Sequence, residues 1–233
     1  MRPLISGHRG SPFKAPENTV SSVKKAIAEG ADAVEIDVHK TKDNQIVVIH
    51  DDKVDRTTNG KGYIKDFTLS ELKKLKINNN EKIPLLQEII NITKGKAKLI
   101  IEIKVKNIEK DVVKLVENNN LVNNIYLISF HHKIVKNIKK INKKIKTGVL
   151  FVGNPINVSE LAKNAEADAL FIGYEHVDKD LVKDVHKNNL KVFVWNIDTI
   201  EDLKEILSLN IDGIGTNKPK LLVNYLKNNK LYK

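Results

Sequence analysis

Short apolar, β-branched segments alternate along the chain with segments of helical periodicity. The expected strands cover residues 4–8, 33–38, 98–105, 124–130, 147–152, 167–174, 191–197 and 212–216. Each is followed by a helix-compatible stretch, as in 17–30, 108–120, 179–189 and 200–210. Eight strands, each trailed by a helix, predict an α/β fold, a TIM (β/α)8 barrel. A doubly wound open sheet is the structural alternative, but open sheets of this width are less common in one domain.

The alternation breaks once, between His50 and about Lys82. We interpret residues 51–82 as a small insertion after the second strand, within a single catalytic domain that covers residues 1–233. The dipeptide Asn59–Gly60 predicts a small hairpin there, and a short helix is expected from Ser70. The next regular helix is expected within 84–93.

Composition narrows the class of protein. With 41% hydrophobic and 30% charged residues, the chain is typical of a folded domain rather than a disordered one. The absence of cysteine excludes disulfides, thiolate metal sites and cysteine nucleophiles. No apolar run approaches the ~18 residues of a membrane span, and the first ten residues lack the apolar core of a secretory signal. We therefore expect a cytoplasmic protein with no stable membrane insertion.

The formal net charge is +11, almost all of it from lysine, because the only arginines are Arg2, Arg9 and Arg56. The densest basic run, residues 136–146, predicts the solvated face of an amphipathic helix. A surface for nucleic acid or an anionic membrane is the alternative. Aromatic residues make up only 5%, which is low for a nucleic-acid reader, so no nucleic-acid partner is expected.

Charged residues interrupt the expected strands near their C-terminal ends, where a barrel carries its active site. Glu35 and Asp37 share one face of a strand, and Glu102 and Lys104 repeat that spacing on the next. Buried carboxylates on one face repel each other, and a divalent cation such as Ca²⁺ or Mg²⁺ would relieve the repulsion. The alternatives are carboxylates at a solvated rim and a plain internal ion pair.

Two histidines are expected at the same end of the barrel. His8 and Arg9 leave the first strand, and His50 follows a short apolar run. Such a pair could supply the acid and the base that cleave a phosphoester, with Arg9 gripping phosphate, although a structural histidine and a surface ion pair would look the same. Trp195 ends the seventh strand, either as packing or as an apolar wall for an alcohol. The other five histidines are interpreted as surface or structural: His39, His131, His132, His176 and His186.

An ordered set of motifs carries a resemblance that covers nearly the whole chain. They are HRG (8–10), PENT (16–19), EIDVHKTKDNQIVVIHD (35–51), DRTTNG (55–60), EIK (102–104), SFHH (129–132) and DGIGTNKP (212–219). In these motifs the chain resembles the glycerophosphodiester phosphodiesterases, in particular their short cytosolic members. The resemblance implies a TIM barrel and a metal-dependent hydrolase that splits glycerophosphodiesters into glycerol 3-phosphate and an alcohol.

The resemblance also implies roles for individual residues. Glu35, Asp37 and Glu102 would bind one divalent cation, usually Ca²⁺ or Mg²⁺. The general acid/base pair would be His8 and His50, Arg9 and Lys104 would hold the phosphate, and Glu17 would orient His8 or Arg9. Trp195 remains a candidate for substrate binding.

The chain departs from the family's usual motifs at two places. Residues 195–198 read WNID where relatives commonly read WTVN, and 216–219 read TNKP where an aspartate often follows the threonine. We expect these changes to affect the substrate pocket rather than the acid/base or metal residues.

Two other activities stay open at this point. Lysophospholipase D activity would need an apolar groove at the mouth, to which Phe67, Leu69 and Leu72 could contribute. A non-catalytic binder of phosphate ligands or anionic surfaces would rest on the +11 charge alone. A small-molecule glycerophosphodiester is the expected partner, and a homodimer is one open oligomeric state.

Overall fold

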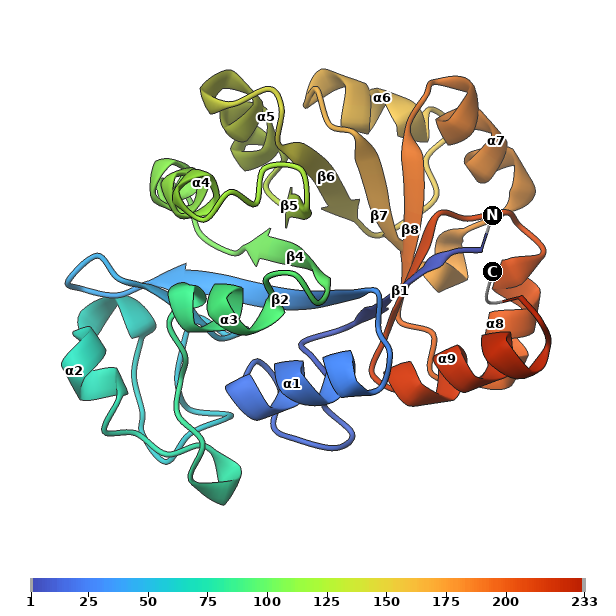
Figure 1. Cartoon of the computed structure of the whole chain (residues 1–233). Coiled ribbons are helices and arrows are strands. Elements are labelled where there is room, and N and C mark those ends of the chain that lie inside the picture. Colours follow the sequence, from blue (N-terminus) through green and yellow to red (C-terminus); the bar gives the residue numbers. More distant parts are fainter. Residues whose placement is uncertain (1, 232–233) are drawn as a thin grey trace.

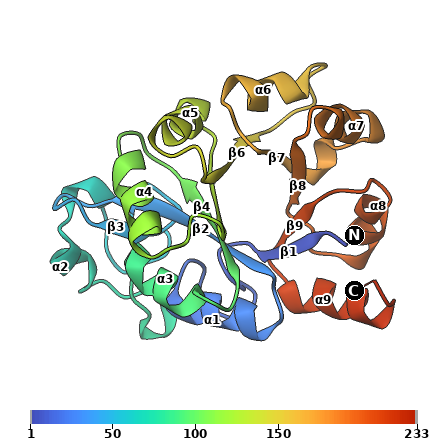
Figure 2. The same cartoon turned by 45° about the horizontal axis from the view of Figure 1, so that its top comes forward.

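The computed structural model describes residues 2–231, which form a closed parallel barrel surrounded by helices (Figures 1 and 2). The strands are β1 (Leu4–Gly7), β2 (Ala33–Lys40), β3 (Ile46–Val48), β4 (Lys98–Ile103), β5 (Ile125–Ser129), β6 (Lys146–Phe151), β7 (Ala169–Gly173), β8 (Lys191–Trp195) and β9 (Gly213–Thr216). Their order is β1-β9-β8-β7-β6-β5-β4-β2-β3, and pairing of β1 with β2 closes the barrel. All pair in parallel except β3, which runs antiparallel to β2. The predicted TIM barrel is confirmed.

The helices follow the strands in turn. They are α1 (Val20–Ala28), α2 (Leu69–Leu72), α3 (Leu86–Thr93), α4 (Glu109–Asn118), α5 (His132–Ile141), α6 (Val158–Asn164), α7 (Lys179–Lys187), α8 (Ile200–Leu207) and α9 (Pro219–Asn228), with short 3₁₀ turns at Ile64–Asp66, Asn78–Asn80 and Tyr174–His176. Thr19 begins α1 by accepting a hydrogen bond from the Ser22 backbone N–H. Asn120 and Asn189 lie just beyond α4 and α7 with φ of 58°, the left-handed conformation that asparagine tolerates at helix ends.

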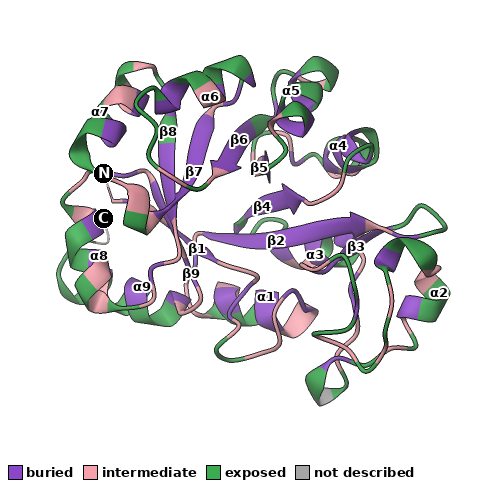
Figure 3. Ribbon diagram, turned by 180° about the vertical axis from the view of Figure 1, so that it is seen from behind, coloured by how far each residue is buried: buried purple, intermediate pink, exposed green. Residues whose placement is uncertain are grey.

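The side chains on the two faces of each strand point in opposite directions, toward the helices and toward the barrel interior. On β2, Val34, Ile36 and Val38 face the helices and are fully buried, whereas Glu35 and Asp37 face the barrel interior. Figure 3 shows the result, with buried residues on the strands and exposed ones on the outer helix surfaces. This alternation places polar side chains of a buried strand inside the barrel.

Aromatic side chains fill the barrel interior below the polar residues. The rings of Phe171 and Phe193 stack with their centroids 4.5 Å apart and an interplanar angle of 7°. Gly148 on β6 makes room for them, because a Cβ there would lie 2.4 Å from the Phe171 ring. The interior is therefore a packed core beneath an open C-terminal mouth.

Aspartates tie the N-terminal ends of neighbouring strands together. Each precedes a strand by one residue and accepts the backbone N–H of the strand beside it, in the pairs Asp32 with Ile5, Asp168 with Thr147, and Asp212 with Val192. Asp168 also pairs with Lys139 and Lys146. The expectation that residues 136–146 form one solvated helix face is thus wrong, because α5 ends at Ile141, Lys139 is buried and Lys146 begins β6.

The segment between β3 and α3 differs from its prediction at Asn59–Gly60. Antiparallel bridges join Lys53 to Tyr63 and Thr58 to Ile77, and the Asn59 side chain accepts the Lys76 backbone N–H at 2.7 Å. The chain does reverse around Asn59–Gly60, as predicted, but the antiparallel pairing of Lys53 with Tyr63 encloses a wide loop, in which Asn59 is held by the distant Lys76 backbone. The short helix is confirmed one residue earlier than expected, at Leu69, where Thr68 and Glu71 form a capping box.

Apolar side chains of this segment form a small core of their own. Leu72 is fully buried, and Phe67 and Leu69 pack against the same cluster as Val54 and Ile64. The lysophospholipase D alternative requires an apolar groove at the barrel mouth. Phe67, Leu69 and Leu72 do not line one, because they pack into this separate core. Among residues 2–231, no helix combines the length and apolar character that crossing a membrane requires.

Candidate active site

A pocket of about 240 Å³ opens at the C-terminal ends of the barrel strands. It gathers most of the residues that the sequence singled out, on different strands and loops. The polar side chains that line it are Ser6, His8, Arg9, Glu35, His50, Glu102, Lys104 and Asn196. Its apolar wall includes Phe130, Trp195, Phe171 and Phe193.

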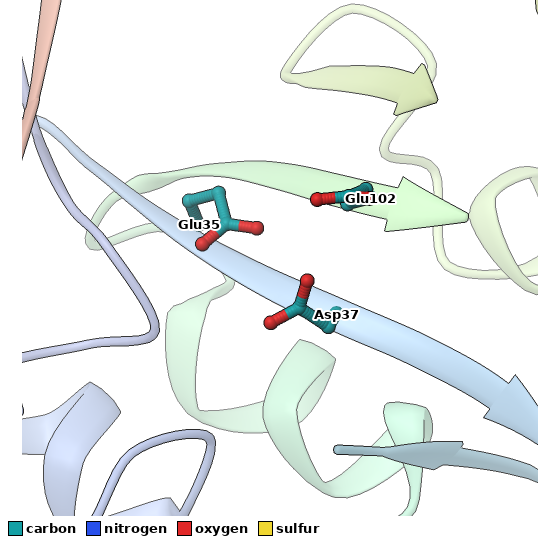
Figure 4. A group of neighbouring side chains, drawn as sticks. All are labelled: Glu35, Asp37 and Glu102. Carbon is teal, nitrogen blue, oxygen red and sulfur yellow. The ribbon is translucent and has the colours of Figure 1, made fainter. Parts of the chain in front are cut away.

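Three carboxylates converge beside this pocket. Glu35 and Asp37 on β2 and Glu102 on β4 each offer an oxygen, and these oxygens lie within 4.8 Å of one another (Figure 4). Asp37 and Glu102 are direct neighbours in the parallel pairing of the two strands. The predicted convergence of the three residues is confirmed, and their backbones are held by the barrel rather than by loops.

Burial makes this cluster electrostatically unusual. Glu35, Asp37 and Glu102 are 8%, 1% and 8% exposed, so little water solvates their charge. Burial, followed by repulsion from Asp37 and Glu102, raises the pKa of Glu35 well above its ordinary value. Burial and Asp37 likewise raise the pKa of Glu102 to about 7. Lys104 and Arg9 lower the pKa of Asp37 even though burial acts in the opposite direction.

The donor set fits a hard divalent cation. The pKa values of Glu35 and Glu102 are raised, and Asp37 depends on Lys104 and Arg9 to offset its burial. A cation would stabilise the negative charge of these three buried carboxylates. Oxygen ligands are those that Ca²⁺ and Mg²⁺ prefer. Asn18 supports the cluster from the loop before α1, since its Nδ2 donates to Asp37 at 2.8 Å and its Oδ1 accepts the Asp37 backbone N–H at 3.2 Å.

The loop after β1 presents His8 and Arg9. Gly10 allows the chain to turn tightly there, with φ of 90° and no room for a Cβ beside Ser22. The Arg9 backbone N–H donates to Glu35 at 3.0 Å, and its guanidinium lies 3.5 Å from Asp37 and 3.0 Å from Glu17. Glu17 therefore orients Arg9, one of its two expected partners.

His8 is held by a residue from the loop after β9, the strand that pairs with β1. Its Nδ1 lies 2.8 Å from Oδ1 of Asn217, in the loop after β9. Burial and the neighbouring Arg9 lower the pKa of His8, which favours the neutral imidazole. The expectation that both departures from the family motifs avoid the acid/base residues is thus wrong for Asn217, because closure of the barrel brings β9 beside β1.

His50 follows β3 and faces the same pocket. Its Nδ1 lies 2.7 Å from Oδ1 of Asp51. The Nε2 of His39 lies 3.0 Å from the backbone carbonyl oxygen of His50, which fixes the chain where it leaves β3. His39 is thus a buried structural residue. His132 and His186 do not line the pocket, and their Nε2 atoms lie 2.9 Å from the Leu150 carbonyl oxygen and from Asp212.

Arg56 connects the two histidine-bearing loops, a role that sequence reasoning missed. Its guanidinium donates to both carboxylate oxygens of Asp51, at 2.7 and 3.0 Å, and to both of Glu17, also at 2.7 and 3.0 Å. A signal was available, because a chain that otherwise uses lysine keeps arginine at only three positions. Only arginine offers such a planar fork.

Lys104 and Trp195 complete the pocket. The Lys104 Nζ lies 2.8 Å from Glu102 and 3.5 Å from Asp37, and these two carboxylates raise its pKa against the opposing effect of burial. The rings of Trp195 and Phe130 meet edge to face with centroids 6.1 Å apart. Trp195 Nε1 and Asn196 Oδ1 are buried without a hydrogen-bond partner among the described residues.

Comparison with known proteins agrees with this geometry. The chain is 35% identical to a glycerophosphodiester phosphodiesterase from Caldanaerobacter subterraneus subsp. tengcongensis, over 97% of this chain and 99% of that relative. A solved phosphodiesterase from Oleispira antarctica, in complex with the product sn-glycerol-3-phosphate, is 26% identical with a TM-score of 0.88 and covers 97% of each chain. A solved glycerophosphodiester phosphodiesterase from Thermotoga maritima is 27% identical, with a TM-score of 0.83 and coverage of 97% of this chain and 99% of that one.

Residues 8–221 match the glycerophosphoryl diester phosphodiesterase family, a span that contains every site residue described above. Fold, site and sequence thus agree, and the chain belongs to the glycerophosphoryl diester phosphodiesterase family, whose members are hydrolases.

Proposed function

We propose that this protein hydrolyses glycerophosphodiesters to glycerol 3-phosphate and an alcohol, using one divalent cation, Ca²⁺ or Mg²⁺. The observation that carries the proposal is the convergence of Glu35, Asp37 and Glu102 beside a pocket that two histidines also line. A binding protein needs neither a pair of proton-transfer groups nor a site for a cation that activates a phosphate. The relative solved with sn-glycerol-3-phosphate supports the same product.

Glu35, Asp37 and Glu102 would hold the cation. When bound there, the cation would supply Lewis-acid stabilisation of negative charge on the phosphate oxygens. Lys104 Nζ and Arg9 Nε each lie 3.5 Å from Asp37, one from each carboxylate oxygen. Both are therefore placed to neutralise the remaining phosphate charge, Arg9 through its fork and Lys104 as a point charge.

The two histidines would divide the proton transfers. Burial and Arg9 lower the pKa of His8, which suits it to accept the proton of the attacking hydroxyl as a neutral base. His50 would then protonate the oxygen of the departing alcohol. The carboxylate of Asp51, 2.7 Å from Nδ1, keeps the other ring nitrogen of His50 for this task.

The substrate's polar groups would find partners on the other wall of the pocket. Trp195 and Asn196 line the pocket, and Trp195 Nε1, a donor, and Asn196 Oδ1, an acceptor, are buried without a partner within the described structure. The indole ring would at the same time pack against the carbon skeleton of the glycerol or the alcohol. A pocket with hydroxyl partners and an apolar wall fits a glycerol phosphate better than inorganic phosphate alone.

The test is release of glycerol 3-phosphate from glycerophosphocholine in Ca²⁺, in Mg²⁺ and in EDTA. We expect release that depends on the cation and is lost in His8→Ala. His186→Ala is the matched control, because His186 pairs with Asp212 at the opposite end of the barrel. Release that persists in EDTA, or no release from several glycerophosphodiesters with either cation, would contradict the proposal. The cytoplasmic location, the lack of a nucleic-acid partner and a homodimer stay predictions.

A further inference from the structure

Two loops meet beside His8. Asp198 lies in the loop after β8 and Asn217 in the loop after β9. The Asp198 carboxylate accepts three hydrogen bonds, from the Asn217 backbone N–H at 2.7 Å, from Asn217 Nδ2 at 2.6 Å and from Thr216 Oγ1 at 3.0 Å. The Asn217 side chain is thereby fixed at one end by the Asp198 side chain.

Donor and acceptor rules then determine the state of His8. A carboxylate only accepts, so the amide NH₂ of Asn217 faces Asp198 and the amide oxygen faces His8. That oxygen lies 2.8 Å from Nδ1 of His8 and can only accept. Nδ1 must therefore carry the proton of the neutral ring, which leaves the lone pair on Nε2.

We propose that Asp198 is a positioning residue that acts through Asn217 to keep His8 in the tautomer whose Nε2 exchanges the proton of the reaction. The inference rests on the proposed function of His8. An amide in contact with the ring fixes the tautomer but, unlike a carboxylate, adds no negative charge that would stabilise the imidazolium. The Asn217 contact thus leaves Nε2 as the proton acceptor, and it raises the pKa of His8 less than burial and Arg9 lower it.

Each of the two departures from the family's usual motifs includes one residue of this hydrogen-bonded pair. Asp198 stands where relatives commonly have asparagine, and Asn217 stands where an aspartate often follows the threonine. The chain keeps one aspartate and one asparagine in contact, in exchanged places. In this chain the negative charge therefore lies on Asp198 and not on residue 217, which contacts His8. Exchanging the two side chains is a direct test.

Asp198→Asn replaces one of the two carboxylate oxygens with an NH₂ donor, so a single oxygen is left for the three donors of Thr216 and Asn217 and the Asn217 amide loses its fixed orientation. We expect kcat for glycerophosphocholine to fall about 10–100-fold with little change in KM, as for other groups that orient an active-site side chain. The ¹⁵N signals of the His8 ring, assigned by their loss in His8→Ala, should change from the Nδ1–H tautomer to a mixture. Asp202→Asn is the matched control, because it removes the same charge four residues further along, where the carboxylate pairs with Thr199.

The double exchange Asp198→Asn with Asn217→Asp separates positioning from mere stability. A carboxylate at 217 should accept the Nδ1 proton directly, so the Nδ1–H tautomer and most of kcat should return. The acid limb of kcat/KM should move to higher pH, because a carboxylate against Nδ1 stabilises the imidazolium. The other groups that act on His8, namely Arg9, Asp37 and His50, are unchanged in every variant.

Ring signals that are the same in wild type and in folded Asp198→Asn would overturn the inference. So would a loss of activity that only follows the loss of folded protein in thermal melts, or a double exchange that leaves the acid limb unmoved. If the wild type hydrolysed no glycerophosphodiester, the proposed function would fail, while the ring signals would still decide whether Asp198 sets the tautomer.

Discussion

Arg56→Lys tests whether the guanidinium bridge between the loops serves the reaction. The guanidinium forms two forks, one on Asp51 and one on Glu17, with four hydrogen bonds of 2.7–3.0 Å. Asp51 in turn holds His50, and Glu17 holds Arg9. Lysine keeps the positive charge but cannot engage both carboxylates in this planar geometry.

The cost in stability should be small. The Arg56 side chain is 47% exposed, so its ion pairs are screened by water. Exposed pairs contribute about 0.2–1 kcal/mol each, and loss of two forks should cost about 1 kcal/mol in total. For a chain of this length that corresponds to a fall in Tm of about 2–4 °C.

The effect on activity should be much larger than the effect on stability. Freed from Arg56, Asp51 and Glu17 would no longer fix His50 and Arg9, and loss of such supporting contacts commonly reduces activity about 10–100-fold. We expect a fall of this size in kcat for release of glycerol 3-phosphate from glycerophosphocholine. Thermal melts and initial rates on the same preparation would separate the two effects.

Arg2→Lys is the matched control. Arg2 forms a fork of the same kind on Asp32, at 2.6 and 2.7 Å, at the N-terminal end of the barrel. It should show a similar fall in Tm with unchanged kcat. Equal kcat values for wild type and Arg56→Lys, or equal losses in both variants, would refute the role of Arg56 in holding the loops.

Three further predictions concern the proposed metal ligand Asp37, the proposed phosphate-binding Lys104 and the structural Asp168. Asp37→Asn should leave the fold intact by circular dichroism but abolish calorimetric binding of Ca²⁺ or Mg²⁺ and lower kcat more than ~100-fold, because several kcal/mol of charge stabilisation depend on the cation; persistent cation binding would contradict this. Lys104→Ala should weaken calorimetric binding of glycerol 3-phosphate about tenfold or more, as expected for loss of one charged contact, and an unchanged Kd would remove Lys104 from phosphate binding. Lys139 and Lys146 lower the pKa of Asp168 against the effect of burial, so its stabilising effect is present above the unfolded pKa of about 3.9 and lost as the pH falls through the lower folded value; Asp168→Asn should therefore lower Tm at pH 7 but little near pH 2, and equal losses at both would be inconsistent with this linkage.

The barrel and the carboxylate cluster could be predicted from the sequence because both follow from periodicity along single strands. Glu35 and Asp37 must share a face of β2, and Glu102 lies on the neighbouring strand β4, so their convergence needs only the strand order. The apolar runs likewise identified the strands to within one or two residues at most ends.

Contacts between loops that are distant in the chain could not be predicted from the sequence. Asn217 reaches His8 only because β9 closes the barrel against β1, and the two lie 209 residues apart. Arg56 meets Glu17 across 39 residues of chain. The hairpin around Asn59–Gly60 is wider than a local turn for the same reason, since Asn59 bonds to the Lys76 backbone. Local pattern carries no information about such partners.

The most direct test of the central claim is a crystal structure of this protein with Mn²⁺ and glycerol 3-phosphate, read through the anomalous signal of the metal. The account predicts one anomalous peak among the carboxylate oxygens of Glu35, Asp37 and Glu102, with the product phosphate held by Arg9 and Lys104. A metal bound elsewhere, or a product phosphate away from that peak, would contradict it.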